Sequence, residues 1–139
     1  VALLILEAFM AVSAFAGGIA LVVGSIWPSW ALGIPVSYLQ GSPFDSYLVP
    51  GLILAIVLGG VNAWAFALLV RRHPFALFAG AIAAFDGLIW IAVELMWIPF
   101  GFLHAVYFTA PLIQIGFVML ALGLGAWRRQ PAPARAGRS

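Results

Sequence analysis

The chain has 139 residues, of which 65% are hydrophobic and only 7% are charged, and its mean hydropathy is +1.17. A soluble domain carries roughly 45–50% apolar and about 25% charged residues, so this composition excludes a soluble globular protein and predicts that lipid surrounds most of the chain. The sequence contains no cysteine, which excludes disulfides and thiolate metal sites, and no lysine, which excludes a Schiff base.

Four apolar segments are long enough to cross a bilayer, which takes about 20 residues. They are residues 1–24, 47–70, 74–97 and 104–126. An Ala-Phe-Ala sequence in the first segment resembles a signal-peptidase site. However, no basic residue precedes it and Glu7 lies inside the apolar run, so we interpret this segment as a membrane span. The expected fold class is all-α, a four-helix transmembrane bundle formed by residues 1–127.

The one long connection, residues 24–51, joins the first two spans and is rich in aromatic residues and prolines. Because Trp and Tyr side chains favour the headgroup region, we expect this loop to lie at the membrane interface. Two interpretations of the loop stay open. It is either a lid over a cavity between the spans or an interfacial plug that seals one end of the bundle.

Small residues repeat every four positions in two of the spans and predict close contacts between helices. The repeats are Ala16, Ala20 and Gly24 in the first span and Ala76, Gly80 and Ala84 in the third. In the second span, the pair Gly59 and Gly60 indicates a close crossing or a local kink.

The basic residues predict the orientation of the bundle. Arg71 and Arg72 lie between the second and third spans, Arg128 and Arg129 follow the fourth, and the other two loops contain no Arg or Lys. The positive-inside rule therefore predicts that both termini are cytoplasmic. Residues 128–139 are expected to form a disordered basic tail on that side. Abundant Ala, Gly and Arg without Lys are typical of a GC-rich bacterial genome, so the expected location is the bacterial inner membrane.

Three of the four acids, Glu7, Asp86 and Glu94, lie within the spans. A charge at the centre of a bilayer costs roughly 2.5–3.5 kcal/mol, so these side chains are expected to face the bundle interior and to have polar partners. Counting depth along the helices gives three candidate partners from other spans. These are Gln114 for Asp86, Asn62 for Glu7, and His104, as an ion-pair partner, for Glu94.

Helical spacing places aromatic residues beside the acids of the third span. At about 100° per residue, Trp90 and Trp97 share one face with Asp86 and Glu94, and Tyr107 adds a hydroxyl from the fourth span. We expect Asp86 to be protonated and to donate a hydrogen bond. Two interpretations of these residues stay open: a proton relay or polar-ligand site, and interhelical hydrogen bonding that specifies the packing.

Catalytic motifs are absent from the sequence, which contains no G-x-S-x-G, no H-E-x-x-H and no P-loop. The two histidines, His73 and His104, are expected on opposite sides of the membrane and therefore cannot share a metal ion. No periodic array of basic residues indicates nucleic-acid binding. We accordingly expect no catalytic residues, no metal site, no cofactor and no nucleic-acid partner.

The segment GSPFDSYLVPGLILAIVLGG at residues 41–60, followed by VELMWIPF at residues 93–100, resembles small uncharacterised bacterial four-span integral membrane proteins. In these, an S-P-F-x-x-Y-x-x-P-G segment opens the second helix. The resemblance implies the four-helix architecture and no activity. Small multidrug transporters are similar in layout and carry an acid in the first helix, where Glu7 lies. The long aromatic loop and the acids of the third span depart from their pattern, so no residue role is carried over.

The leading hypothesis is a non-enzymatic integral membrane protein, either an accessory or structural subunit or a bundle that binds a lipid or hydrophobic ligand. Its expected partners are membrane lipids, a larger membrane complex or further copies of itself. The alternative is a small proton-coupled transporter in which Asp86 and Glu94 exchange protons against a ligand held among the aromatic residues. A third hypothesis is a lipid- or quinone-modifying enzyme that uses Glu94 and His104 as acid and base.

Overall fold

The computed structural model describes residues 1–30 and 32–127, and every regular element in this part of the chain is helical. Three elements, α1, α4 and α5, form long helices by themselves, and three others, α2, η3 and α3, join into one continuous rod. The elements are α1 (Ala2–Ile26), η1 (Pro28–Trp30), η2 (Val36–Leu39), α2 (Leu48–Ile53), η3 (Leu54–Gly59), α3 (Gly60–Val70), α4 (Ala76–Glu94) and α5 (Phe102–Trp127). The predicted tail, residues 128–139, lies outside the described residues.

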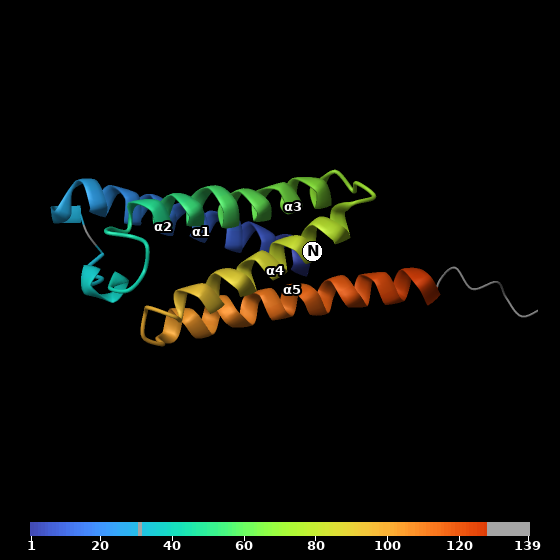
Figure 1. Ribbon diagram of the computed structural model, residues 1–139. Helices are drawn as coiled ribbons and strands as arrows, with labels where there is room; N and C mark the ends of the chain where they lie inside the picture. The colour runs from blue at the N-terminus through green and yellow to red at the C-terminus, as the bar shows by residue number, and fades with distance from the viewer. Residues whose placement is uncertain (31, 128–139) are drawn as a thin grey trace, which may run out of the picture.

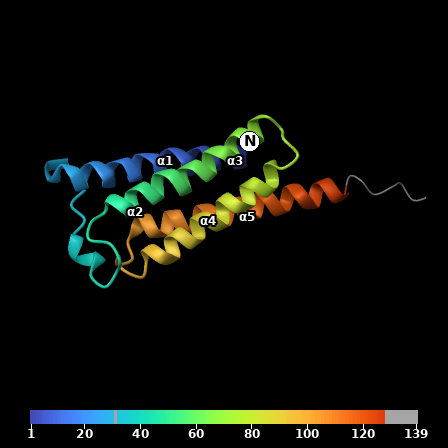
Figure 2. The same cartoon turned by 45° about the horizontal axis from the view of Figure 1, so that its top comes forward.

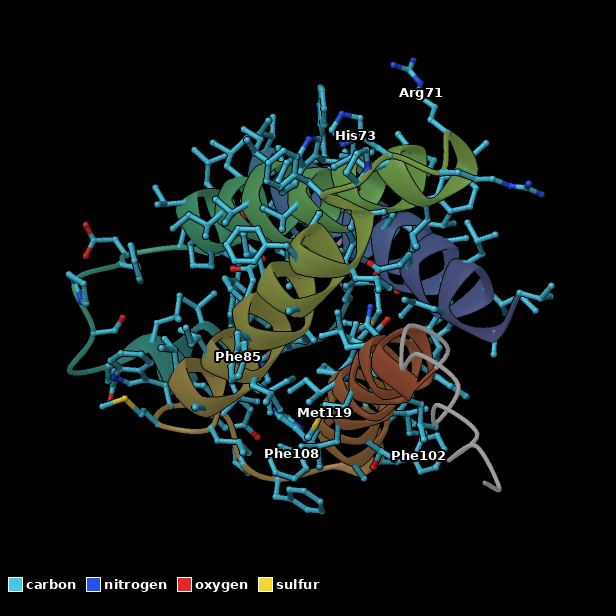
Figure 3. All side chains as sticks on the ribbon, turned by 90° about the vertical axis from the view of Figure 1, so that its right-hand side faces the viewer. Arg71, His73, Phe85, Phe102, Phe108 and Met119 are labelled. Carbon is cyan, nitrogen blue, oxygen red and sulfur yellow. The ribbon has the colours of Figure 1, made fainter. Side chains whose placement is uncertain are left out.

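Four helical rods are long and apolar enough to cross a membrane: α1, the continuous rod from α2 to α3, α4 and α5. In three of them only 22% of the most apolar stretch is buried inside the protein, and in α4 the share is 39%. Most apolar side chains therefore point outward. This arrangement is unfavourable in water and favourable among lipid tails. Phe85, Phe102 and Met119 are examples of such exposed side chains (Figure 3). The all-α four-span bundle predicted from the sequence is confirmed.

The rods run roughly along one another, with α1 beside the α2–α3 rod and α5 beside α4 (Figures 1 and 2). The N-terminus, the turn between α3 and α4, and the C-terminal end of α5 lie at one end of the molecule (Figure 1). We call this the basic end, because exposed Arg71 and Arg72 lie there and Arg71 extends away from the helices (Figure 3). Residues 27–47 and the turn 95–101 lie at the opposite end, which we call the loop end (Figure 1).

Helices α1 and α2 cross in direct backbone contact. A Cβ atom added to Gly18 would lie 2.6 Å from the carbonyl oxygen of Gly51, and one added to Gly51 would lie 2.8 Å from the carbonyl oxygen of Gly18. Only glycine permits this approach. The small residues of α1 that are buried are Ala11, Ala14 and Gly18, whereas Ala16 is exposed. The repeat expected from the sequence therefore does not form the contact, although Ala76, Gly80 and Ala84 of α4 are all buried as expected.

The second rod contains a widened turn. Residues 54–59 form a π-helical segment, η3, directly before Gly60. The expected local irregularity at the glycine pair is present, and a Cβ atom on Gly59 would lie 3.1 Å from the ring of Phe15 in α1. Because a π turn holds one extra residue, it rotates the side chains of α3 relative to those of α2. Asn62 faces the interior as a fully buried residue just after this turn.

Helices α4 and α5 pack along one another around a proline. Pro111 lies inside α5 and is fully buried, and a Cβ atom on Gly87 of α4 would lie only 2.8 Å from its ring. Proline cannot donate a backbone hydrogen bond, so the carbonyl one turn earlier lacks its usual helical partner. Because Gly87 has no side chain, the ring of Pro111 fits against α4 at this point, and this contact fixes where the two helices cross.

Candidate ligand-binding site

A fully buried polar cluster joins three of the four rods. Gln114 of α5 donates a hydrogen bond from Nε2 to Oδ1 of Asn62 in α3, at 3.2 Å, and Asn62 donates from Nδ2 to the carbonyl oxygen of Leu58, at 2.9 Å. Both amide side chains are 0% exposed, and Glu7 of α1 is also 0% exposed. Hydrogen bonds of this kind fix how transmembrane helices rotate against each other, each contributing about 0.6 kcal/mol.

Glu7 is the least satisfied member of this interior. Neither of its carboxyl oxygens has a hydrogen-bond partner within the described residues, and neither does Oε1 of Gln114. Gly80 of α4 packs on the carboxyl group, since a Cβ atom there would lie 3.2 Å from Oε1 of Glu7. A neutral carboxylic acid has one O–H to donate, and the orphaned oxygen of Gln114 is an acceptor. These donors and acceptors therefore fit a neutral Glu7. All four rods meet at the carboxyl group of this residue.

Asp86 does not belong to the cluster, although its depth in the sequence matched that of Gln114. It is partly buried on α4, and its Oδ2 has no hydrogen-bond partner within the described residues. It faces a cavity together with Pro50 and Val57 of the second rod. Equal depth along the helices does not make two residues neighbours: the side chain of Gln114 bonds to Asn62, whereas Asp86 lines a cavity with the second rod.

Two cavities lie at the loop end. Cavity 1, of about 510 Å³, lies between α1, α4 and α5 and is covered by residues 32–35 and Tyr38 of the long loop. Cavity 2, of about 270 Å³, lies between the second rod and α4 and is covered by Leu39, Phe44 and Tyr47. Trp90 and Glu94 line both cavities and form part of the wall between them.

Helical spacing predicted that four residues share one face of α4, and all four line cavity 2. These are Asp86, Trp90, Glu94 and Trp97. Trp97 belongs to the turn after α4, because the helix ends at Glu94, three residues earlier than expected. Tyr107 of α5 lines cavity 1 and stacks on Phe9 of α1, with ring centroids 6.1 Å apart.

His104 and Glu94 line the same cavity but do not form the expected ion pair. The backbone N–H of Gly101 donates to Nδ1 of His104 at 3.1 Å, and Nε2 has no hydrogen-bond partner within the described residues. An imidazole that accepts at Nδ1 carries its proton on Nε2 and is neutral. The turn between α4 and α5 therefore satisfies one nitrogen of the ring, and the other remains a buried donor at cavity 1.

Tyr47 holds the loop over these cavities, a role that was not predicted from the sequence, because the aromatic residues of the loop were expected only to favour the membrane interface. Its side chain is 7% exposed, and its hydroxyl donates to the carbonyl oxygen of Pro35 at 2.9 Å. Burial, and then the nearby Tyr38 and Glu94, raise the pKa of Tyr47 above the ordinary value of 10.0. The available signal was its position at the start of the second rod, where a side chain can pack against the bundle. A Tyr buried there needs a hydrogen-bond partner for its hydroxyl.

Within the described residues there is no group of three or more His, Asp or Glu side chains placed to hold a metal ion. The fold and the two cavities define a multi-pass membrane protein with space at one end of its bundle. Comparison of the chain with models of known families, with curated proteins and with solved structures found no match. The resemblance to bacterial four-span proteins thus stays an expectation.

Proposed function

We propose that this protein is a non-enzymatic integral membrane protein that binds a lipid or another hydrophobic ligand in cavity 1. The observation that carries the proposal is the cavity itself: its volume of about 510 Å³ lies within the roughly 300–1,000 Å³ typical of small-molecule sites. Its lining is mostly aliphatic and aromatic, with a few polar side chains that include Glu94 and His104, which is the usual composition of such a site.

The route to cavity 1 supports a ligand that comes from the membrane. A third, shallower cavity of about 430 Å³ lies between α1 and α5, lined by Leu6, Phe9, Ala110 and Ile113 among others. Each of these residues belongs to a rod that crosses the bilayer, so the groove faces lipid. A hydrophobic ligand would reach the seam between α1 and α5 without passing through water.

The same apolar outer faces would let the bundle join a larger membrane complex or associate with further copies of itself. In either case we place both termini in the cytoplasm of a bacterial cell and the loop end outside the inner membrane, because the arginines flank the basic end.

A proton-coupled transporter is the second candidate, and cavity 2 beside Asp86 is the observation in its favour. Passage across the membrane would need a continuation toward the basic end. The interior there is filled by fully buried side chains, among them Met10, Glu7, Asn62 and Gln114. This packing favours binding over transport.

Filling cavity 1 tests the proposal. Gly17 of α1 lines the cavity, and a Cβ atom added to it would meet only a side-chain carbon of Leu54, at an ordinary 3.5 Å. Gly17→Leu should therefore preserve the fold and weaken ligand binding by about tenfold, since the new side chain occupies volume that the ligand needs and fitting both costs about 1–3 kcal/mol. The measurement is the number of lipid molecules retained by the detergent-purified protein in native mass spectrometry.

Gly116→Leu is the matched control, because a Cβ atom on Gly116 meets nothing within 4 Å. This variant should retain as much lipid as the native chain. Equal retention by Gly17→Leu and the native chain, with both folded, would contradict binding in cavity 1.

A further inference from the structure

Two polar side chains in the lining of cavity 1, His104 and Glu94, offer a donor and an acceptor to its occupant. His104 is only 8% exposed, and its unpartnered Nε2–H is the donor. Glu94 lines the same cavity and supplies the acceptor. A ligand that leaves a buried donor such as this one unpaired loses affinity, so the headgroup that fits carries an acceptor for His104.

The distribution of charge excludes an anionic headgroup. All six basic residues of the chain lie at positions 71–72 or beyond 127, and none lies in the loops at the loop end. A lipid whose headgroup has a net negative charge would meet no cationic side chain in cavity 1 and would lie beside the acid Glu94, whereas in a zwitterionic lipid the ammonium group offsets the charge of the phosphate. A cationic group has the opposite preference, because it pairs with Glu94 and also gains from the aromatic face of Trp90 in the same wall.

Glu94 also distinguishes a primary ammonium headgroup from a quaternary one. A carboxylate only accepts hydrogen bonds, so burying it beside a ligand is favourable when the ligand donates. A primary ammonium group has three N–H donors, whereas a quaternary ammonium group has none. Glu94 therefore favours a primary amine over a choline group.

Resting on the proposed function, we propose that cavity 1 binds an ethanolamine phospholipid from the leaflet at the loop end. Its ammonium group lies at Glu94, and its phosphate accepts a hydrogen bond from Nε2 of His104. The acyl chains follow the apolar seam between α1 and α5, where the stacked rings of Phe9 and Tyr107 lie between cavity 1 and the shallower groove.

The test is a competition measured by native mass spectrometry. Delipidated protein in detergent is given equal amounts of phosphatidylethanolamine, phosphatidylcholine and phosphatidylglycerol with identical acyl chains. The native chain should prefer phosphatidylethanolamine by about tenfold, because a hydrogen bond to a charged group contributes enough free energy for that factor. Glu94→Gln should abolish the preference for phosphatidylethanolamine over phosphatidylcholine. His104→Ala should weaken the binding of both of these lipids.

Asp45→Asn is the matched control, since it removes one acid from an exposed position of the long loop outside both cavities. It should leave the preference unchanged. An excess of soluble glycerophosphoethanolamine should not displace the lipid if the acyl chains are part of the ligand. Displacement by this compound would overturn a phospholipid as the occupant and favour the free headgroup compound.

Two outcomes separate this inference from the proposed function. If the native chain binds all three lipids equally and Gly17→Leu releases them, cavity 1 binds lipid and the headgroup assignment is wrong. If the native chain retains no lipid at all, the proposed function fails together with the assignment. A preference that survives Glu94→Gln also overturns the assignment.

Discussion

Glu7 is buried against all the other rods, and its neighbours determine what can replace it. Glutamine has the same size, and its amide can donate to the orphaned Oε1 of Gln114. Glu7→Gln should therefore keep the free energy of unfolding within about 1 kcal/mol of native. Glu7→Ala leaves a cavity and the unpaired Gln114 oxygen, and should cost about 2 kcal/mol or more. Thermal or denaturant unfolding in detergent measures both.

Ile5→Ala is the control on the same helix, because Ile5 is 63% exposed and faces outward. It should change stability little. If Glu7→Ala were as stable as Ile5→Ala, Glu7 would have no part in holding the rods together.

The sequence predicted correctly that Glu7 and Gln114 face the interior, but it did not predict the hydrogen-bond partner of Gln114. That Glu7 and Gln114 face the interior follows from the cost of polar groups in lipid. That Gln114 bonds to Asn62 and not to Asp86 depends on how each helix is rotated, and hydrophobic periodicity is weak when every face of a helix is apolar. The role of Tyr47 was missed for a different reason, because the aromatic residues of a loop beside a span are expected at the headgroup region and not in the bundle.

At the scale of elements, the crossing of α1 and α2 depends on two glycines that touch. Gly18→Ala should push the helices apart, because the new Cβ atom would lie 2.6 Å from a backbone oxygen that cannot move independently. The expected cost is about 1–3 kcal/mol. Gly60→Ala makes the same chemical change where nothing lies within 4 Å, and should be neutral or slightly stabilising because alanine favours helix.

Unfolding of the two alanine variants in the same detergent provides the comparison. Equal stability would show that the close approach of α1 and α2 does not support the bundle.

Element boundaries were predictable to within a few residues, because apolar length alone sets where a span can begin and end. The choice among small residues was not. Span one carries small residues on several faces, and the sequence does not say which face meets α2; the structure buries Ala11, Ala14 and Gly18. The π-helical segment η3 shifts the faces of the second rod further, and its only sequence signal was the glycine pair.

At the scale of the whole molecule, an even number of spans brings the N-terminus, Arg71 and Arg72, and the end of α5 to one end, while the cavities and their loop lie at the other (Figure 1). Span count and arginine positions were sufficient to predict this. The cavities were not predictable, because they depend on how far neighbouring rods stand apart beneath the loop, and no pattern in a single sequence reports that separation.

We propose that hydrocarbon surrounds the four rods and that the loop end and the basic end face opposite sides of the membrane. The cysteine-free chain allows a direct measurement, because single cysteines placed at exposed Gln40 in the loop or at exposed Pro74 in the α3–α4 turn are the only thiols present. A membrane-impermeant maleimide applied to intact cells should label Gln40→Cys, and should label Pro74→Cys only after the membrane is permeabilised. Labelling of both positions from the outside would show that the two ends do not face opposite sides of the membrane.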